Sequence, residues 1–366
     1  MEERLTAAGG ELLAGIADGV ATVTLNRPAA LNALTMGMIE GLAAWLDAWE
    51  ADDSVRVVLL KGAGEKAFCA GGDIRALREN HLAGGDHSRR FFIVEYALDH
   101  RIHRYPKPVV ALVDGIVMGG GMGIAQGARL RLAGPRTRLA MPETAIGLFP
   151  DVGGSWFLPR CPGRIGAYLG LVGPTLGASD SLYAGLVDAS AAPEAIARLP
   201  AELAGCALAE DPMAAVDSLR ARLARDTPGP GELARLRPAI DRHFALPAVE
   251  AIVASLERET DPAFLPWADK TRALLATRSP TLLKVTLEQL RRGAGIGLAE
   301  GLRMEYGLVQ ACFDQGDFLE GVRALIVDKD NAPRWNPSSL AEVSDAAVAA
   351  FFAPRWAPAE HPLARL

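Results

Sequence analysis

Three glycine-rich segments carry the residue types that could do chemistry. They are AFCAGGDI (67–74), DGIVMGGGMG (114–123) and MPETAIGLFPDVGG (141–154), and each follows or ends a predicted strand. In the first segment, small residues after a strand let a ligand approach the backbone, and consecutive N–H groups can point at one oxygen. Taken alone, this segment fits an ordinary tight turn between a strand and a helix better.

The second segment places four glycines among the five residues from Gly119 to Gly123. Inside a helix, each glycine costs roughly 1 kcal/mol relative to alanine. At the start of a helix that cost falls, and the unpaired N–H groups there carry a positive potential. A thioester oxygen that gains negative charge in a transition state would suit this place. In enzymes that use such N–H donors, the loss of one donor lowers the rate by about 10²–10³-fold. A phosphate cradle is the alternative, but the glycine motifs G-x-G-x-x-G and G-x-x-x-x-G-K-[ST] are both absent.

The third segment places two carboxylates, Glu143 and Asp151, in an otherwise apolar loop interrupted by glycine and proline. Carboxylates in apolar surroundings tend to have raised pKa values, which suits acid–base work near neutral pH. The alternative is structural: Glu143 caps backbone amides and Asp151 closes a turn.

Alternating strands and helices must position these segments. Strands are predicted at 19–25, 55–60 and 109–113, and a helix that carries Trp45 and Trp49 on its packed face is predicted after the N-cap Thr35. The continuous apolar run at 109–113 is typical of a parallel strand covered on both faces. Repeated strand–helix units predict an α/β fold with a parallel sheet, although the strand order cannot be read from the sequence.

The last third of the chain has a helical pattern. Leucine and alanine at helical spacing predict helices at 213–225 and 248–258, separated by a break at 227–230, and a further helix at 279–293. We therefore predict two domains, a core at 1–200 that carries the site and a mostly helical region at 201–366 that completes the fold.

Composition narrows the class of protein. The 366 residues are 50% hydrophobic, carry a formal charge of −6 and show no basic stripe, which argues against nucleic acid as a partner. Four scattered cysteines without a C-x-x-C pair predict free thiols in a reducing compartment, and no Cys/His cluster predicts a metal site. The acidic N-terminus does not look like a secretory signal or a transit peptide, and no apolar run approaches the roughly 20 residues that cross a bilayer. We expect a cytoplasmic protein that is not bound to membranes.

The three segments, in this order and spacing, resemble the enoyl-CoA hydratase/isomerase (crotonase) superfamily, and most closely its 3-hydroxyisobutyryl-CoA hydrolase branch. The motifs that carry the likeness are AFCAGGDIRAL, FF-x-x-EY, PKPVVALVDGIVMGGG, MPETAIGLFPDVGG with FLPR, YAGLVD, SPTLLKVTL, MEY with LVQACF, and EGVRALIVDKDNAPRW. They run from about Val20 to about Leu340. The resemblance implies a crotonase-like spiral of ββα units with a mostly helical C-terminal region.

The resemblance also implies residue roles. The N–H groups of Gly72 and Gly120 would hold the thioester oxygen, Glu143 would do the chemistry, and Asp151 is the aspartate of the hydrolase branch. Glu95 matches a glutamate near the acyl group. Gly123 stands where hydratases carry a second catalytic glutamate, which argues against efficient hydration. The neighbours of the first amide are also predicted to line the substrate: Ala70, Gly71, Asp73 and Ile74.

The reaction these roles imply is hydrolysis of a short branched 3-hydroxyacyl-CoA, with an acyl-CoA as partner and no cofactor beyond that substrate. Glu143 would activate water or attack to form a mixed anhydride, and the sequence leaves this choice open. Asp151 would orient the water or the substrate hydroxyl. Cys69 fits a buried apolar residue better than a nucleophile, because no histidine accompanies it. An isomerase-type reaction that uses Glu143 alone, a non-catalytic acyl-CoA-binding protein and a homo-oligomer stay open.

Overall fold

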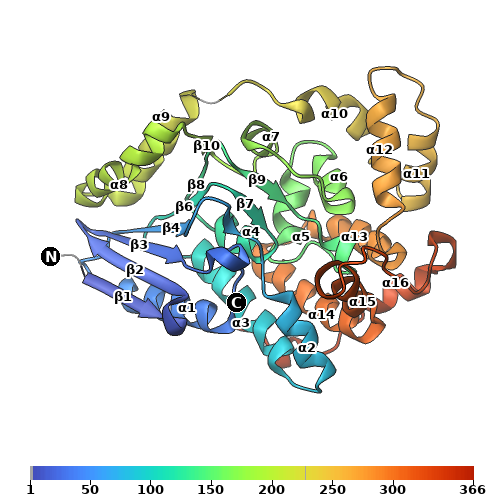
Figure 1. Cartoon of the computed structure of the whole chain (residues 1–366), viewed down its shortest axis with the longest axis horizontal. Helices are drawn as coiled ribbons and strands as arrows, with labels where there is room; N and C mark the ends of the chain where they lie inside the picture. Colours follow the sequence, from blue (N-terminus) through green and yellow to red (C-terminus); the bar gives the residue numbers. More distant parts are fainter. Residues whose placement is uncertain (1–2, 227) are drawn as a thin grey trace. The chain divides into compact units, whose positions relative to one another are not determined.

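The computed structural model describes residues 3–226 and 228–366 (Figure 1). The chain packs into two compact units, each made of several segments. Unit 1 comprises Met1–Asp73, Val94–Leu139 and Thr175–Gly231, and unit 2 comprises Ile74–Ile93, Ala140–Pro174 and Glu232–Leu366. Both units contain residues from either side of position 200, so they do not correspond to the two predicted domains, 1–200 and 201–366. The predicted domain boundary stays a prediction.

Unit 1 is built on a seven-stranded sheet with the strand order β1-β2-β3-β4-β6-β8-β10. The first three strands pair antiparallel, and the pairs from β3 onward that have a recorded register are parallel. The strands are β1 (Glu3–Ala7), β2 (Leu12–Ala17), β3 (Val20–Leu25), β4 (Val57–Gly62), β6 (Val109–Val113), β8 (Leu130–Ala133) and β10 (Ala189–Ser190). The predicted parallel sheet is therefore confirmed.

Two of the three predicted strands, β3 and β6, match their predicted ranges, whereas β4 begins two residues late. The N–H groups of Arg56 and Val57 both donate to the Gly19 carbonyl, at 2.8 and 3.1 Å. Because Gly19 turns the chain with a φ of 78°, the parallel register begins only with Val20 opposite Val57. The start of β4 is thus set by its partner strand.

Helices of unit 1 pack against its strands. They are α1 (Met36–Glu50), α4 (Gly120–Gln126), α7 (Ala178–Tyr183), α8 (Pro193–Leu208) and α9 (Pro212–Leu223). Helix α1 begins where predicted, since the Thr35 hydroxyl accepts a hydrogen bond from the Met38 N–H. Trp49 is buried and stacks on Trp45, which confirms that these two rings belong to a packed helix face. Side chains of α8 and α9 form one core cluster with those of β3, β4, β6, β8 and β10.

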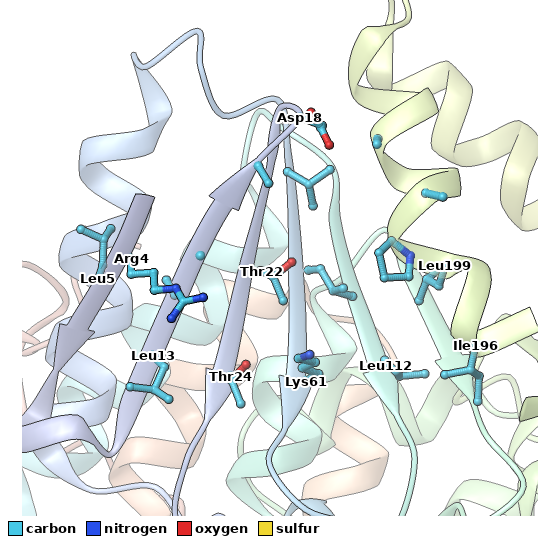
Figure 2. A pocket seen from close by; sticks show the side chains of 18 of the residues that line it. Arg4, Leu5, Leu13, Asp18, Thr22, Thr24, Lys61, Leu112, Ile196 and Leu199 are labelled. Atoms are coloured by element: carbon cyan, nitrogen blue, oxygen red, sulfur yellow. The ribbon is translucent and has the colours of Figure 1, made fainter. Parts of the chain in front are cut away.

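The sheet face beside α8 is only partly covered, which leaves a groove of about 940 Å³ (Figure 2). Thr22, Thr24 and Lys61 line it from the strands, and Ile196 and Leu199 line it from α8. None of the residues predicted to do chemistry lines this groove. The candidate site therefore lies elsewhere.

A second, three-stranded sheet carries the glycine-rich turns. Its order is β5-β7-β9, with β5 (Ala67–Cys69), β7 (Ile116–Met118) and β9 (Arg138–Ala140). Strands β5 and β7 are parallel. Since parallel strands end at the same edge of a sheet, the turns after β5 and β7 leave from one edge.

Unit 2 is helical. Its helices are α2 (Ile74–Leu82), α5 (Gly154–Phe157), α6 (Ile165–Val172), α10 (Glu232–His243), α11 (Val249–Glu257), α12 (Leu265–Leu275), α13 (Pro280–Gly293), α14 (Leu298–Gln315), α15 (Asp317–Val322) and α16 (Asp345–Phe351), and α3 (His87–His103) contributes to both units. Helices α9, α11 and α13 confirm the predicted C-terminal helices. The predicted break at 227–230 includes Thr227, which lies outside the described residues, and 228–230 are not helical. No helix among the described residues has both the length and the apolarity needed to cross a membrane.

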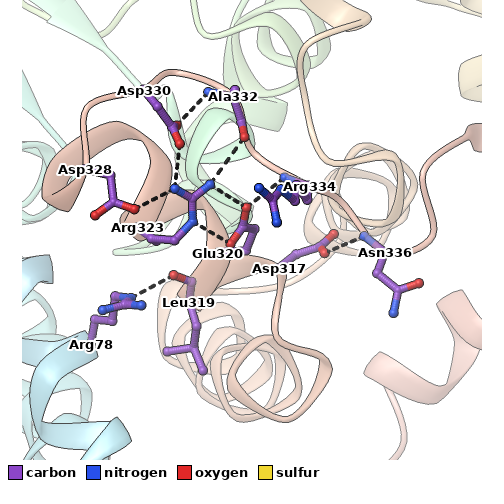
Figure 3. Close-up of polar contacts among 10 residues, drawn as sticks. All are labelled: Arg78, Asp317, Leu319, Glu320, Arg323, Asp328, Asp330, Ala332, Arg334 and Asn336. Carbon is purple, nitrogen blue, oxygen red and sulfur yellow. Dashed lines mark hydrogen bonds and ion pairs between the residues drawn. The ribbon is translucent and has the colours of Figure 1, made fainter.

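An arginine cluster fixes the end of α15 (Figure 3). Arg323 pairs with Glu320, Asp328 and Asp330 at 2.7–2.8 Å, and Glu320 also accepts the Arg334 N–H at 2.8 Å. These bonds hold the segment that follows α15 against the helix. The start of α15 in turn packs on the turn at Gly147, where an added Cβ would collide with the Asp317 carbonyl. The cluster therefore supports the turn that carries Glu143.

We predict that Asn32→Ala destabilises the protein by roughly 2–5 kcal/mol, because it leaves buried carbonyl groups without a donor. The fully buried Asn32 amide donates to the carbonyls of Ala63 and Ala67, at 3.0 and 2.8 Å, and its oxygen accepts the Arg27 N–H. Chemical denaturation measures the free energy of unfolding. The matched control is Asn331→Ala, since Asn331 has a similar positive φ but is exposed. Equal losses in the two variants would contradict the prediction.

Candidate active site

The first two glycine-rich segments lie side by side in unit 1. Gly71, after β5, has a φ of 104°, and Gly119, after β7, has a φ of 48°. A Cβ added to Gly71 would lie 3.3 Å from the Met118 carbonyl oxygen and 3.6 Å from the Gly120 amide nitrogen. Glycine is favoured at position 71 because this φ lies in the left-handed region and an added Cβ would crowd the Met118 carbonyl.

The loop before α1 frames the first segment. Three backbone hydrogen bonds of 2.8–3.0 Å join the loop to the segment. The Ala70 N–H donates to the Leu31 carbonyl. Leu34 donates its N–H to the Gly71 carbonyl and accepts the Asp73 N–H with its own carbonyl. The amide of Gly72 lies between these bonds and donates to no backbone carbonyl among the described residues. Gly72 is partly exposed. Its N–H is thus held in place and is available to a ligand.

The second segment begins a helix, as predicted. In α4 the N–H groups of Met122 and Gly123 both donate to the Gly119 carbonyl, at 2.7 and 3.2 Å. The N–H groups of Gly120 and Gly121 precede these bonds and have no backbone acceptor among the described residues. Positive potential at a helix start favours an acceptor oxygen there.

Glu95 lies against the second segment. Its side chain is buried, with 2% exposed, and Oε1 occupies the space that a Cβ on Gly120 would need. Glu95 and Gly120 are therefore neighbours within unit 1, whereas the predicted place of Glu95 near the acyl group stays a prediction. One turn further along α3, Asp99 is also buried, with 3% exposed, and faces Gly123. The sequence analysis missed Asp99, although its spacing of four residues from Glu95 places both acids on one helix face.

Two of the predicted substrate-lining residues, Asp73 and Ile74, have further structural roles. The Asp73 carboxylate accepts from Arg27 at 3.2 Å, and Arg27 also pairs with Glu11 at 3.0 Å. Asp73 is thus engaged by the protein itself. Ile74 is the first residue of α2 and belongs to unit 2. Substrate contacts of Ala70, Gly71, Asp73 and Ile74 stay predictions.

Glu143 begins a short 3-10 helix of unit 2, η3 (Glu143–Ile146), and is 4% exposed. Burial raises the pKa of Glu143 well above its usual 4.5, and the nearby Asp151 charge raises it further, whereas the residue's own N–H opposes the shift. Oε2 has no hydrogen-bond partner among the described residues. A base with a raised pKa accepts a proton more readily near neutral pH. This carboxylate therefore fits acid–base work better than a structural cap.

Asp151 lies in a strained turn that a distant glutamate holds. The following residue, Val152, has a φ of 51°, which is rare for a β-branched residue and costs energy. Glu305 of α14 accepts the N–H groups of Gly153 and Ser155, each at 2.8 Å, and the Ser155 hydroxyl. Burial raises the pKa of Glu305 to about 8. Glu305 is a second residue that the sequence analysis missed, because it is more than 140 positions from this turn.

Burial of the cysteines argues against a nucleophilic role. All four are buried free thiols, as predicted. Burial raises the pKa of Cys69 to about 12, the Gly71 backbone opposes the shift, and the charges of Glu95 and Asp99 add to it. Because the thiolate is the reactive form, this raised pKa argues against Cys69 as a nucleophile at neutral pH. No group of three or more potential metal ligands occurs among the described residues.

The site residues thus fall into two sets. Gly72, Gly120 and Glu95 belong to unit 1, and Glu143 and Asp151 belong to unit 2. Within each unit, the expected neighbours lie together. The expected meeting of the two amides with Glu143 stays a prediction.

Relatives of this chain carry hydrolase names. Residues 20–352 match the family model described as enoyl-CoA hydratase/isomerase. The chain is 44% identical over 92% of its length to 3-hydroxyisobutyryl-CoA hydrolase, mitochondrial, of Danio rerio, and covers 88% of that protein. It is 40% identical over 88% of its length to the protein of the same name from Homo sapiens, and covers 83% of it.

Solved structures with other names share the fold. A carnitinyl-CoA dehydratase from Mycobacterium thermoresistibile matches with a TM-score of 0.85 and 41% identity, over 94% of this chain and 96% of that one. An enoyl-CoA hydratase from Rhodobacter sphaeroides 2.4.1 matches with a TM-score of 0.84 and 40% identity, over 94% and 98%. The fold and the paired glycine turns are those of a crotonase-type α/β protein. The chain belongs to the enoyl-CoA hydratase/isomerase family.

We predict that Glu305→Gln changes how stability depends on pH. The folded state holds the Glu305 proton more tightly than the unfolded chain, since the pKa rises from 4.5 to about 8. The wild type therefore loses stability through this group as the pH rises across that window, whereas the variant does not. The free energy of unfolding of E305Q minus that of the wild type should rise with pH, measured by urea denaturation.

Glu259→Gln is the matched control, because Arg242, His243 and two backbone N–H groups bind Glu259 and lower its pKa to about 2. Glu259 stabilises the fold above its usual pKa, and that stability is lost as the pH falls toward about 2. Its difference curve should be flat between pH 5 and 8. A flat curve for E305Q in the same range would contradict the prediction.

Proposed function

We propose that this protein hydrolyses 3-hydroxyisobutyryl-CoA to 3-hydroxyisobutyrate and coenzyme A, a reaction that belongs to valine breakdown. The observation that carries the proposal is the identity of 40–44% with proteins named for this hydrolysis, over 88% or more of the chain. The site supports it, because it offers unpaired backbone donors and a buried carboxylate with a raised pKa.

The donors suit an oxyanion. Attack on a thioester carbonyl turns its oxygen into a negatively charged alkoxide, and fixed N–H dipoles stabilise that charge without rearranging. We assign this role to the amides of Gly72 and Gly120. Glycine at the neighbouring position 71 permits the close approach of the two turns. The same donors bind the ground-state carbonyl more weakly, so their effect appears in the rate.

Glu143 is assigned the chemical step. As a general base, its carboxylate takes a proton from water while the water oxygen attacks the carbonyl carbon. As a nucleophile, a carboxylate oxygen attacks, coenzyme A leaves as a thiolate that takes up a proton, and water then opens the mixed anhydride. Both routes break the same carbon–sulfur bond and consume one water. Asp151, whose charge acts on Glu143, would orient that water or the substrate hydroxyl.

Hydration or dehydration of an acyl-CoA is the second candidate. The two solved relatives of 40–41% identity bear hydratase and dehydratase names. One local observation favours it as well, because the Asp99 carboxylate fills the space beside Gly123, where the resemblance implied that an acid is missing. Hydration of an enoyl-CoA without release of thiol would establish this alternative. The loss of the ultraviolet absorbance of the enoyl group monitors that hydration.

Several further properties are part of the proposal. We expect an acyl-CoA as the partner, no cofactor beyond that substrate, and a homo-oligomer as an open alternative to a monomer. A cytoplasmic location stays a prediction from the sequence, whereas the vertebrate relatives are named mitochondrial. Fractionation of cells that express the full chain tests the location.

We predict that Glu143→Gln lowers turnover by about 10²–10⁴-fold, because the amide can neither accept the proton nor attack. The measurement is free thiol release from 3-hydroxyisobutyryl-CoA with a thiol reagent. All four cysteines are buried, which keeps the protein's own reaction with the reagent low. Glu259→Gln removes another buried carboxylate of unit 2 and should leave turnover unchanged. No release by the wild type at any substrate concentration would overturn the proposed function.

We predict that Gly72→Pro lowers kcat by about 10²–10³-fold, because proline has no N–H to donate. Gly72→Ala keeps the amide and serves as the matched control for changes in backbone freedom. The two variants are compared by the same thiol assay, with circular dichroism to verify the fold. Equal kcat values for both variants would refute the role of this amide.

A further inference from the structure

Two buried acids of α3 pack against the glycine face of α4. A Cβ on Gly120 would collide with Glu95, and a Cβ on Gly123 would lie 2.6 and 2.7 Å from the two Asp99 oxygens. A Cβ on Gly127, just after α4, would lie 2.8 Å from the His103 amide nitrogen. The glycine face of α4 and the side of α3 that carries the two acids are therefore in close contact from Gly120 to Gly127. This contact leaves the acid side chains little freedom.

Asp99 fills the space next to Gly123 completely. Cβ atoms do not approach other heavy atoms to 2.6 Å, so even a methyl group at position 123 would displace the Asp99 carboxylate. Asp99 thus occupies the glycine face of α4 one turn beyond Glu95, whose Oε1 lies beside Gly120 at the start of the helix.

Electrostatic interactions favour the same position of the Glu95 carboxylate as the packing does. Glu95 and Asp99 both act on the Cys69 thiol and raise its pKa, so both lie near the end of β5. Like charges one helical turn apart repel each other. The N–H groups of Gly120 and Gly121 at the start of α4 attract a carboxylate. Asp99 therefore favours the position of Glu95 beside Gly120.

We propose that Asp99 is a positioning residue for the thioester reaction, which fixes the Glu95 carboxylate beside the Gly120 amide. The inference rests on the proposed function, since the Gly120 amide is the donor assigned to the thioester oxygen. Asp99 acts through Glu95 and does not itself touch the substrate. Its removal should misplace Glu95 and leave the oxyanion donors in place.

The test is a double-mutant cycle on kcat/KM with 3-hydroxyisobutyryl-CoA. Asp99→Ala should lower kcat/KM by about 10²-fold in the wild type, as small misplacements of a site residue do. In the Glu95→Ala background the same change should have no further effect, because Glu95 is then absent. Additive losses would overturn the inference. Asp99→Asn, which keeps the shape, is the second variant if Asp99→Ala does not fold, and it should retain more activity.

A second cycle tests the geometry without the assay. Gly123→Ala should destabilise the wild type, because the methyl group meets Asp99, and should be tolerated in the Asp99→Ala background. Equal destabilisation in both backgrounds would show that Asp99 does not occupy this space and would overturn the inference. Asp188→Ala is the control variant, because it removes another carboxylate of unit 1, the partner of Arg131. It should lower the stability and leave kcat/KM unchanged.

The outcomes separate the two proposals. If the wild type releases no thiol, the proposed function fails and the inference fails with it. If the wild type releases thiol and the 95/99 cycle is additive, only the inference fails. If the wild type hydrates an enoyl-CoA and Asp99→Asn abolishes that hydration, Asp99 is a catalytic acid, and the positioning role is wrong.

Discussion

The parallel pairing of β5 with β7 is the constraint on which the candidate site of unit 1 depends. It brings the turns after the two strands to one edge, where a Cβ on Gly71 would lie 3.3–3.6 Å from the backbone at 118–120. A side chain at this position would crowd that backbone and would have to adopt a φ of 104°, which only glycine tolerates well. The amides of Gly72 and Gly120 are positioned by backbone hydrogen bonds around them, so their directions are fixed before any ligand binds. Preorganised donors of this kind stabilise developing charge more effectively than flexible side chains.

Burial of carboxylates is the second constraint, and it is costly to the fold. Glu143 and Glu305 both have raised pKa values because water is excluded from them, so each disfavours the folded state when it ionises. Glu305 offsets part of its cost by accepting three hydrogen bonds from the turn that follows Asp151. Glu143 has an oxygen without any partner among the described residues. An uncompensated polar atom of this kind is more readily explained by chemistry than by stability.

Much of this architecture was predictable from local sequence, and the rest was not for identifiable reasons. The strands β3 and β6, the Thr35 cap and the helix start at Gly120 follow from patterns a few residues long. The start of β4 depends on Gly19, a turn residue just before β3 whose carbonyl accepts from Arg56 and Val57. Asp99 and Glu305 contact residues 24 or more positions away, at Gly123 and at the turn after Asp151, and local sequence patterns do not reveal such contacts. The roles of Gly72, Gly120 and Glu143 came from the family resemblance and not from spacing.

Position 123 shows why a residue type alone cannot decide the reaction. A glycine there suggested that one acid of a hydratase is missing, which would favour hydrolysis. The structure fills that same space with the carboxylate of Asp99, supplied by a different helix. The glycine therefore shows only that α4 does not provide the acid. Two solved structures with dehydratase and hydratase names share this fold at 40–41% identity, so the fold alone does not determine the reaction. The distinction between hydrolysis and hydration depends on the charges and positions of Asp99 and Asp151 relative to the residues beside them. The shared fold does not determine these local features.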